Sequence, residues 1–221
     1  MVCGLAAAAA AQSITVTGSV VITRTGKTKG DNSGAVVSLT PTGMTAPQPK
    51  KTFTIMQKDK RFDPHVLAIP AGSQVAFPNF DPFFHNVFSM FDGRRFDLGL
   101  YEAGASRTAL FPRVGVCYIF CNIHPEMTAI IVVVDTPYYT ITDASGHFSF
   151  SNVAPGQYRL DVWHERAQSN TPAEFPRMVM VSPTIPDLDP IKLIDSGKLT
   201  VTHKNKYGRD YDTPSTGPSY R

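Results

Sequence analysis

Short segments in which apolar and polar residues alternate, or in which β-branched residues cluster, run along most of the chain. Alternation with a period of two residues predicts half-buried β-strands, and no stretch shows the 3.6-residue period of a convincing amphipathic helix. Clusters of Gly, Pro, Asn and Asp separate the segments, as in Asp31-Asn-Ser-Gly34. We therefore predict an all-β protein of the sandwich type. The predicted strands span residues 14–24, 35–40, 73–77, 87–89, 114–120, 129–135, 147–150 and 157–163.

Composition and length narrow the class of protein. The chain has 221 residues, a formal net charge of +3, 42% hydrophobic residues and 18% charged residues. This length suits one or two globular domains, and the charge is too small to predict a nucleic-acid partner. No apolar stretch near the N-terminus reaches the ~20 residues that a membrane-spanning helix needs. We expect no nucleic acid as a partner and no membrane span.

Residues 1–11 end in an Ala-rich stretch that is typical of the end of a secretory signal peptide. A signal-peptide remnant there predicts a periplasmic or secreted protein. Its removal would take Cys3 away and leave Cys117 and Cys121 as the only cysteines. Four residues apart on a strand, their Cα atoms would be ~13 Å from each other, beyond the ~7 Å limit for a disulfide. We expect no structural disulfide.

Four side chains of the types that bind copper lie in two short segments. Cys121, His124 and Met127 fall within residues 121–127, and His85 lies upstream between apolar runs. One thiolate, two imidazoles and a weak axial thioether form the ligand set of blue-copper electron-transfer centres. The motif therefore predicts a single type 1 copper ion held by these four residues, in an electron-transfer protein.

Residues 62–135 resemble the cupredoxin family. The resemblance rests on Phe77-Pro-Asn79, on His85-Asn-Val87 and on residues 115–127. Within the family, the short ligand loop is most similar to amicyanin, the electron acceptor of methylamine dehydrogenase. The resemblance implies a Greek-key sandwich, a blue copper protein and single-electron transfer.

The same resemblance implies roles for residues around the ligands. Asn86 would hydrogen-bond across to the ligand loop near Asn122, as a second-shell residue that does not touch copper. The ring edge of His124 would reach the surface, where a redox protein, as donor or acceptor, would dock. An apolar patch for that docking would include Phe83, Phe84, Ile123 and Pro125.

The flanking segments, residues 12–61 and 136–203, together resemble a carboxypeptidase-regulatory-like (transthyretin-like) β-sandwich. This resemblance rests on residues 18–40, 140–150 and 153–160. It implies that the cupredoxin domain, 62–135, is nested in a loop of the second sandwich, as in secreted bacterial proteins called methylamine-utilisation-like. Residues 204–221 are polar, and we expect them to form a flexible C-terminal tail.

Alternatives to a single blue copper ion remain open. Cys117 and Cys121, followed by His and Met, also resemble the binuclear purple copper site of cytochrome oxidase, in which Cys117 would be an extra thiolate. The loop here is one residue shorter, which favours one copper ion over two. A copper-binding or trafficking protein and a cupredoxin-like structural module without a redox role are the alternative functions.

We do not expect an enzyme from the sequence. Copper oxidases and nitrite reductases built on this sandwich place a His beside the ligand Cys, whereas Cys121 is flanked by Phe120 and Asn122. No nucleophile–base pair, phosphate loop or carboxylate pair is recognisable. The remaining histidines belong to no ligand set and are expected at the surface; they are His65, His147, His164 and His203.

Overall fold

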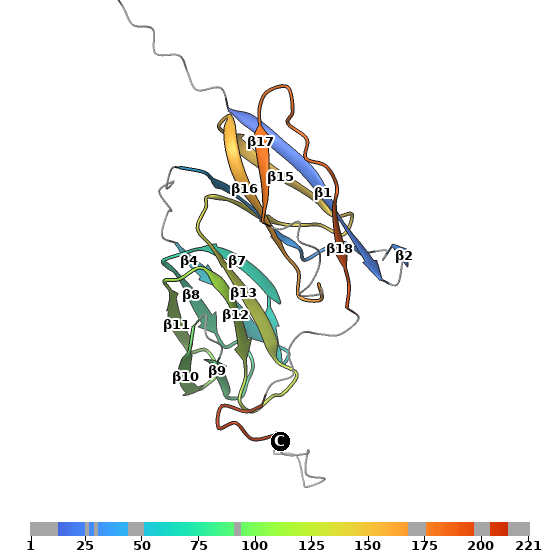
Figure 1. The fold of residues 1–221 in the computed structure, drawn as a ribbon. Coiled ribbons are helices and arrows are strands. Elements are labelled where there is room, and N and C mark those ends of the chain that lie inside the picture. Colours follow the sequence, from blue (N-terminus) through green and yellow to red (C-terminus); the bar gives the residue numbers. More distant parts are fainter. Residues whose placement is uncertain are drawn as a thin grey trace, which may run out of the picture. The chain divides into compact units, whose positions relative to one another are not determined.

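A computed structural model describes residues 13–24, 27–28, 31–43, 51–90, 94–167, 176–196 and 204–211. Every regular element in these residues is a β-strand (Figure 1). The prediction of an all-β protein is confirmed. No helix within the described ranges is long and apolar enough to cross a membrane. The strands are β1 (Ile14–Arg24), β2 (Lys27–Thr28), β3 (Val36–Pro41), β4 (Thr52–Thr54), β5 (Met56–Lys58), β6 (Arg61–Asp63), β7 (Val66–Pro70), β8 (Ser73–Pro78), β9 (His85–Ser89), β10 (Phe96–Tyr101), β11 (Ser106–Phe111), β12 (Gly115–Phe120), β13 (Thr128–Val134), β14 (Tyr138–Ile141), β15 (His147–Val153), β16 (Gly156–Trp163), β17 (Arg177–Val181) and β18 (Ile191–Ile194).

Sequence alternation identified β1, β3, β8, β9, β12, β13, β15 and β16. Several of the missed strands are only two to four residues long, and in β10 and β11 the alternation is broken or weak. In β10 the pairing register with β9 shifts between Asp97 and Leu100, and Gly99 there has a φ of 73°. An extra residue at such a bulge removes the two-residue period. In β11 the first three residues are all exposed, so no buried face is visible in the sequence until Ala109.

Contacts divide the chain into two units that are interleaved in sequence. Unit 1 comprises residues 1–46 and 138–198, and unit 2 comprises residues 47–137 and 199–221. The chain therefore enters unit 2 at residue 47 and not at residue 62 as we expected. The reason is that β4, which precedes residue 62, pairs in parallel with β8 and so adds a strand to a sheet of unit 2.

Unit 1 contains two four-stranded sheets. One has the order β15-β1-β18 with β2 beside β1, and the other has the order β14-β3-β16-β17. Both sheets contribute to one hydrophobic core, which includes Val16, Val20, Leu39 and Leu160. Burying these side chains is the main favourable contribution to the folding of the unit.

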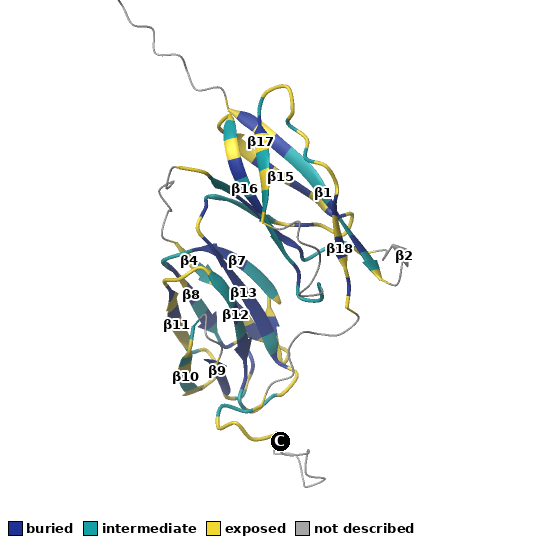
Figure 2. Cartoon of the chain, viewed as in Figure 1, coloured by how far each residue is buried: buried dark blue, intermediate teal, exposed yellow. Residues whose placement is uncertain are grey.

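Unit 2 contains a five-stranded sheet, β10-β9-β12-β13-β7, and a three-stranded sheet, β11-β8-β4. Their apolar side chains form a second core that includes Phe77, Ile119 and Ile131. All five residues of β9 are buried, and so are six of the seven residues of β13 (Figure 2). The central strands of this sheet are thus covered on both faces and form a rigid support for the loops at their ends.

Candidate metal centre

The strand order of unit 2 brings the two segments of ligand-type residues together. Strands β12 and β13 are antiparallel neighbours, and the ligand loop, residues 121–127, connects them. Strand β9 also runs antiparallel to β12, with Phe88 opposite Phe120. The start of β9 therefore lies at the same end of the sheet as the ligand loop, which brings His85 to Cys121 across 36 residues of sequence.

Three of the four expected ligands meet at this end of the sheet. Sγ of Cys121 lies 3.8 Å from Nδ1 of His85 and 3.6 Å from Nδ1 of His124. The ligand atoms of these three residues all lie within 4.8 Å of one another, and the described part of the chain holds no other such group of His, Cys, Asp and Glu side chains. The imidazole rings of His85 and His124 are in edge contact, with 4.9 Å between centroids.

The thiol of Cys121 is fully buried, and its surroundings suit a sulfur ligand. Burial raises its pKa, and hydrogen bonds from the backbone amides of Asn86, Ile123 and His124 act in the opposite direction. These three amides donate to the sulfur and therefore favour the thiolate. A bound cation would add to the same effect, because a coordinating thiol is deprotonated outright.

His85 is fully buried, and its second nitrogen is held by a carboxylate. Nε2 of His85 donates to Asp81 at 2.8 Å, so Nδ1 is left as the acceptor that faces Cys121. Burial opposes ionisation of Asp81, yet hydrogen bonds from the Lys60 amide, from His85 and from the Asp59 amide hold its pKa below the usual value. A carboxylate of this kind sets the tautomer and orientation of a metal-binding imidazole. Sequence reasoning missed Asp81, because nothing in its local pattern distinguishes it from a loop aspartate.

His124 is half-buried and lies against aromatic and basic neighbours. Burial lowers the pKa of its imidazole, and the neighbouring His85 and Lys60 lower it further. The ring of Phe83 packs 5.7 Å from His124 and 5.2 Å from His85, measured between centroids. Since the pKa lies below its ordinary value, His124 is neutral and able to ligate a metal at neutral pH.

Met127 is fully buried at the end of the ligand loop. Its amide donates to the carbonyl of His124 at 3.0 Å, and its carbonyl accepts from the amide of Cys121 at 3.2 Å. These two hydrogen bonds close the loop into a tight turn that spans the three ligand-type residues of the motif. The assignment of the thioether as an axial ligand stays a prediction.

Asn86 makes different hydrogen bonds from those implied by the cupredoxin resemblance. Its side chain donates to Asp97 at 2.7 Å and to the carbonyl of Gly99 at 3.0 Å, both on β10. Asn122, the expected partner, instead accepts from the amide of Lys206 at 2.9 Å. Asn86 still contacts the centre, through its backbone amide and the sulfur of Cys121.

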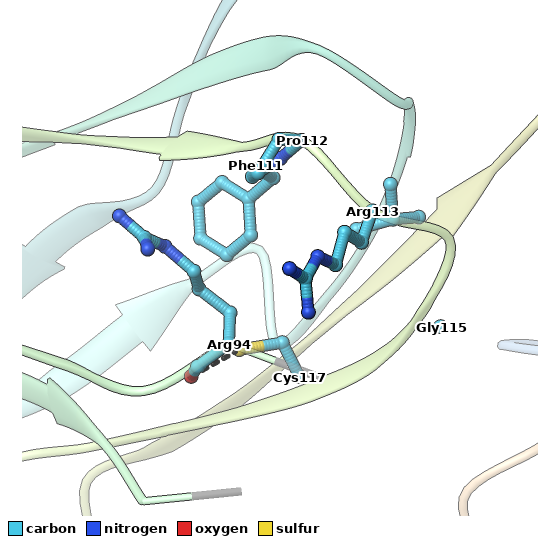
Figure 3. A pocket seen from close by; sticks show the side chains of 7 residues that line it. Arg94, Phe111, Pro112, Arg113, Gly115 and Cys117 are labelled. Atoms are coloured by element: carbon cyan, nitrogen blue, oxygen red, sulfur yellow. Dashed lines mark hydrogen bonds between the residues drawn. The ribbon is translucent and has the colours of Figure 1, made fainter. Parts of the chain in front are cut away.

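Cys117 lies on β12, the strand that leads into the ligand loop, but its thiol contacts none of the expected copper ligands. Its sulfur contacts the hydroxyl of Ser89 at 3.3 Å and the carbonyl of Arg94 at 3.5 Å. Figure 3 shows the sulfur directed toward Arg94, in a small pocket that Phe111 and Arg113 also line. Burial raises the pKa of this thiol to about 11, so it is protonated and behaves as a small apolar side chain.

Of the histidines expected at the surface, His65 and His147 are exposed, while His164 is buried with 6% of its surface accessible. His164 follows β16 in unit 1, and its Nδ1 accepts from the amide of Arg166 at 3.3 Å. The surface prediction for His164 is therefore wrong, since it satisfies its polar atoms inside the fold. His203 lies outside the described residues, as do residues 1–11 with the expected signal-peptide remnant.

The C-terminal segment differs from the expectation of a flexible tail over 204–221. Residues 204–211 fold against unit 2 beside the ligand loop, at the lower end of that unit in Figure 1. The hydroxyl of Tyr211 donates to the carbonyl of Cys121 at 2.9 Å. This packing could not be predicted from the polar composition of the segment, because the segment contacts the loop through hydrogen bonds and not through apolar side chains. Residues 212–221 lie outside the described residues.

Comparisons with known proteins cover parts of the chain. The family model for polysaccharide lyase family 4, domain II, matches residues 134–171, most of which belong to unit 1. The carboxypeptidase-regulatory-like resemblance of the flanks stays a prediction. A search of curated proteins finds no match.

The solved structures that are similar to this chain include a purple cupredoxin, amicyanin and a copper-containing nitrite reductase. A purple cupredoxin from Nitrosopumilus maritimus is 23% identical, with a TM-score of 0.34 over 37% of this chain and 99% of that chain. A reduced Cu(I) form of an amicyanin mutant is 17% identical, with a TM-score of 0.36 over 46% of this chain and 99% of that one. A Cu-containing nitrite reductase from Thermus scotoductus SA-01 is 27% identical, with a TM-score of 0.37; the match covers 44% of this chain and only 25% of the reductase.

The last of these similarities corrects one expectation from the sequence. We expected a protein that is not an enzyme, but the similar structures include a nitrite reductase beside electron carriers. The expectation that the chain is not an enzyme is therefore not supported by the structures to which it is similar. The solved structures similar to this chain share the cupredoxin sandwich, and the chain is an all-β protein with a His-Cys-His group in unit 2.

Proposed function

We propose that this chain binds one copper ion as a type 1 centre and acts as a single-electron carrier in the periplasm. The observation that supports this most is the meeting of His85, Cys121 and His124 around one point at the end of a buried sheet. Two imidazoles and a thiolate are the equatorial ligands of blue-copper sites. Met127, on the same loop, is the residue we assign to the weak axial position.

The spacing of the ligand atoms fits a metal ion. Bonds of ~2.0 Å to imidazole and ~2.3 Å to thiolate, the lengths found for zinc, place nitrogen and sulfur about 3.7 Å apart at a trigonal angle. The two sulfur–nitrogen distances here are 3.6 and 3.8 Å. Soft thiolate and thioether donors beside imidazole favour copper over metals that prefer oxygen ligands.

The surroundings of the site suit electron transfer. Copper, when bound, supplies a one-electron couple between its +1 and +2 states. The ligands are held by β9, β12 and the short turn before β13, all anchored in the core of unit 2. Because close-packed cores resist deformation, the ligand atoms keep nearly one arrangement in both states, and that lowers the barrier to transfer.

His124 offers the route by which electrons would enter or leave. It is half-buried, whereas Ile123 and Phe84 nearby have 44% and 55% of their surfaces exposed. Apolar side chains around a ligand that reaches the surface suit brief docking of a redox protein. Glu126, exposed on the same loop, adds a negative charge that would help to select the partner.

The test is spectroscopic. Purified protein loaded with Cu(II) should show a strong absorption band near ~600 nm and a four-line copper hyperfine pattern in electron paramagnetic resonance. Cys121→Ser should abolish the band, while Cys117→Ser, at a second buried cysteine, on β12, is the matched control and should keep it. A band that survives Cys121→Ser would contradict the proposal. A seven-line pattern that disappears in Cys117→Ser would indicate a binuclear centre.

Retention of the metal distinguishes a carrier from a trafficking protein. A carrier should keep its copper through repeated reduction and oxidation in the presence of a Cu(I) chelator, because its ligands change little between the two states. Transfer of the metal to the chelator on each reduction would favour trafficking instead.

A further inference from the structure

We propose that residues 204–211 form a strap that positions the ligand loop, with Tyr211 and Lys206 as its positioning residues. An effect of this strap on a bound copper ion depends on the proposed function, whereas the contacts between the strap and the loop are present without a metal. This strap reaches the loop from a part of the chain that follows unit 1 in sequence.

The strap is a folded turn in its own right. The side-chain oxygen of Asn205 accepts from the amides of Tyr207 and Arg209, at 3.0 and 3.1 Å. The amide of Gly208 donates to the carbonyl of Asn205, and Gly208 has a φ of 74°, a backbone conformation that favours glycine. An Asx-type turn closed by glycine holds its shape without burying apolar surface. This is why a polar segment can still be ordered.

Two hydrogen bonds join the strap directly to the ligand loop. Tyr211 donates its hydroxyl proton to the carbonyl of Cys121 at 2.9 Å, and the amide of Lys206 donates to Oδ1 of Asn122 at 2.9 Å. A tyrosine hydroxyl is protonated at neutral pH, so Tyr211 is the donor and the carbonyl is the acceptor in this bond. Both bonds fall on the first two residues of the loop, where the sulfur ligand is attached.

A chain of polar contacts also links Lys206 of the strap to the sulfur of Cys121, through Asp97 and Asn86. Nζ of Lys206 lies 2.7 Å from Oδ2 of Asp97, while Oδ1 of Asp97 accepts from the side chain of Asn86 at 2.7 Å. The amide of Asn86 in turn donates to the sulfur of Cys121. The ammonium group of Lys206 thus orients Asp97, which orients Asn86 at the start of β9. A network of this kind couples the strap to both ligand-bearing segments.

The strap holds the loop through these bonds and not by covering it. A pocket of about 460 Å³ lies between Ile123 and Pro125 on the loop and Tyr207 and Arg209 on the strap. Tyr207 is 71% exposed. Because this open space separates Ile123 and Pro125 from Tyr207 and Arg209, apolar contact between them contributes little, and loss of the specific hydrogen bonds should release the loop.

The experiment compares two double variants of the full chain. Lys206→Met with Tyr211→Phe removes the ion pair and the hydroxyl donor. Lys204→Met with Tyr139→Phe makes the same chemical changes, at a strap lysine that is 62% exposed compared with 19% for Lys206 and at a half-buried tyrosine of β14 in unit 1. Hydrogen exchange of the metal-free proteins, followed by mass spectrometry, reports the opening of the ligand loop without any copper. Peptides from β7 and β13 report whether the sandwich is folded.

We expect exchange in residues 121–127 to be about ten-fold faster in the first variant and unchanged in the control, the factor that loss of one or two hydrogen bonds produces. After loading with Cu(II), the first variant should also show a shifted visible band, which a purely structural role elsewhere would not produce. Loop exchange equal to that of the control would overturn the strap. If the unaltered protein takes up no copper, the proposed function fails, while the exchange data still decide the strap.

Discussion

The carboxylate of Asp81 lies 2.8 Å from Nε2 of His85, and the opposite nitrogen of the same ring faces the sulfur of Cys121. Asp81 also accepts hydrogen bonds from the amides of Asp59 and Lys60, both of which have positive φ angles. Two such residues between β5 and β6 form a tight hairpin turn of the primed type. One buried carboxylate therefore fixes both a hairpin and the imidazole of a candidate ligand.

Asp81→Asn should weaken copper binding about 10–100-fold, the usual cost of losing the carboxylate that orients a metal-binding histidine. The physical reason is that a neutral amide oxygen accepts the Nε2 proton more weakly than a carboxylate does, so the tautomer with its proton on Nε2 is less favoured. Competition with a chelator of known affinity measures the change. Glu102→Gln, at an exposed acid of the same unit, is the control and should bind as the unaltered protein does. Equal affinities for the two variants would remove Asp81 from the site.

Met127→Leu should keep the copper and the blue colour but raise the reduction potential. The axial thioether bond is long and weak, so its loss costs little affinity, while loss of a donor destabilises the +2 state more than the +1 state. Cyclic voltammetry measures the potential. Met178→Leu, at a methionine 50% exposed on β17 in unit 1, makes the same change far from the ligand set in sequence. An unchanged potential in Met127→Leu would mean that the thioether is not a ligand.

Asn86→Ala should lower the free energy of unfolding of unit 2 by about 1–3 kcal/mol, because it removes the two hydrogen bonds that this fully buried side chain donates to Asp97 and Gly99. Asn86→Asp should be more harmful, since it places a second carboxylate against Asp97. Chemical denaturation of the metal-free protein followed by circular dichroism measures both. If Asn86→Asp proves as stable as the unaltered protein, the hydrogen bond from Asn86 to Asp97 does not stabilise unit 2.

His164 should make the stability of unit 1 depend on pH. Burial lowers the pKa of its imidazole below the ordinary 6.5, although Glu165 and Asp195 act in the opposite direction. The unfolded chain therefore binds a proton more readily than the folded chain, so stability is greatest above pH 6.5 and falls as the pH decreases toward the folded pKa. His164→Gln should remove this loss.

The chain offers a convenient probe for that measurement. Trp163 is its only tryptophan and lies at the end of β16, next to His164 in unit 1. Urea denaturation followed by its fluorescence at pH 8 and at pH 5.5 gives the unfolding midpoints at the two values. The same decrease in midpoint for the unaltered protein and for His164→Gln would show that another group titrates.

The sequence was enough to predict the ligand loop, because three of the four expected ligands lie within residues 121–127. Cys121, His124 and Met127 lie on one short loop, and a turn of that length brings their backbones together in almost any sandwich. Strand alternation was equally readable where one face of a strand is buried and the other exposed, as in β1 and β15. Both signals depend on neighbours within a few residues.

Only the tertiary structure decided what lies around that loop. Asp81 is four residues from His85 in sequence and Asp97 is eleven from Asn86, whereas Lys206 lies 109 residues from Asp97. Each of the three looks like an ordinary surface charge in its local context. The buried position of His164 likewise depends on contacts with residues more than 100 positions away, such as Ser33. Hydrogen bonds between polar side chains leave no period in a sequence, whereas burial of apolar faces does.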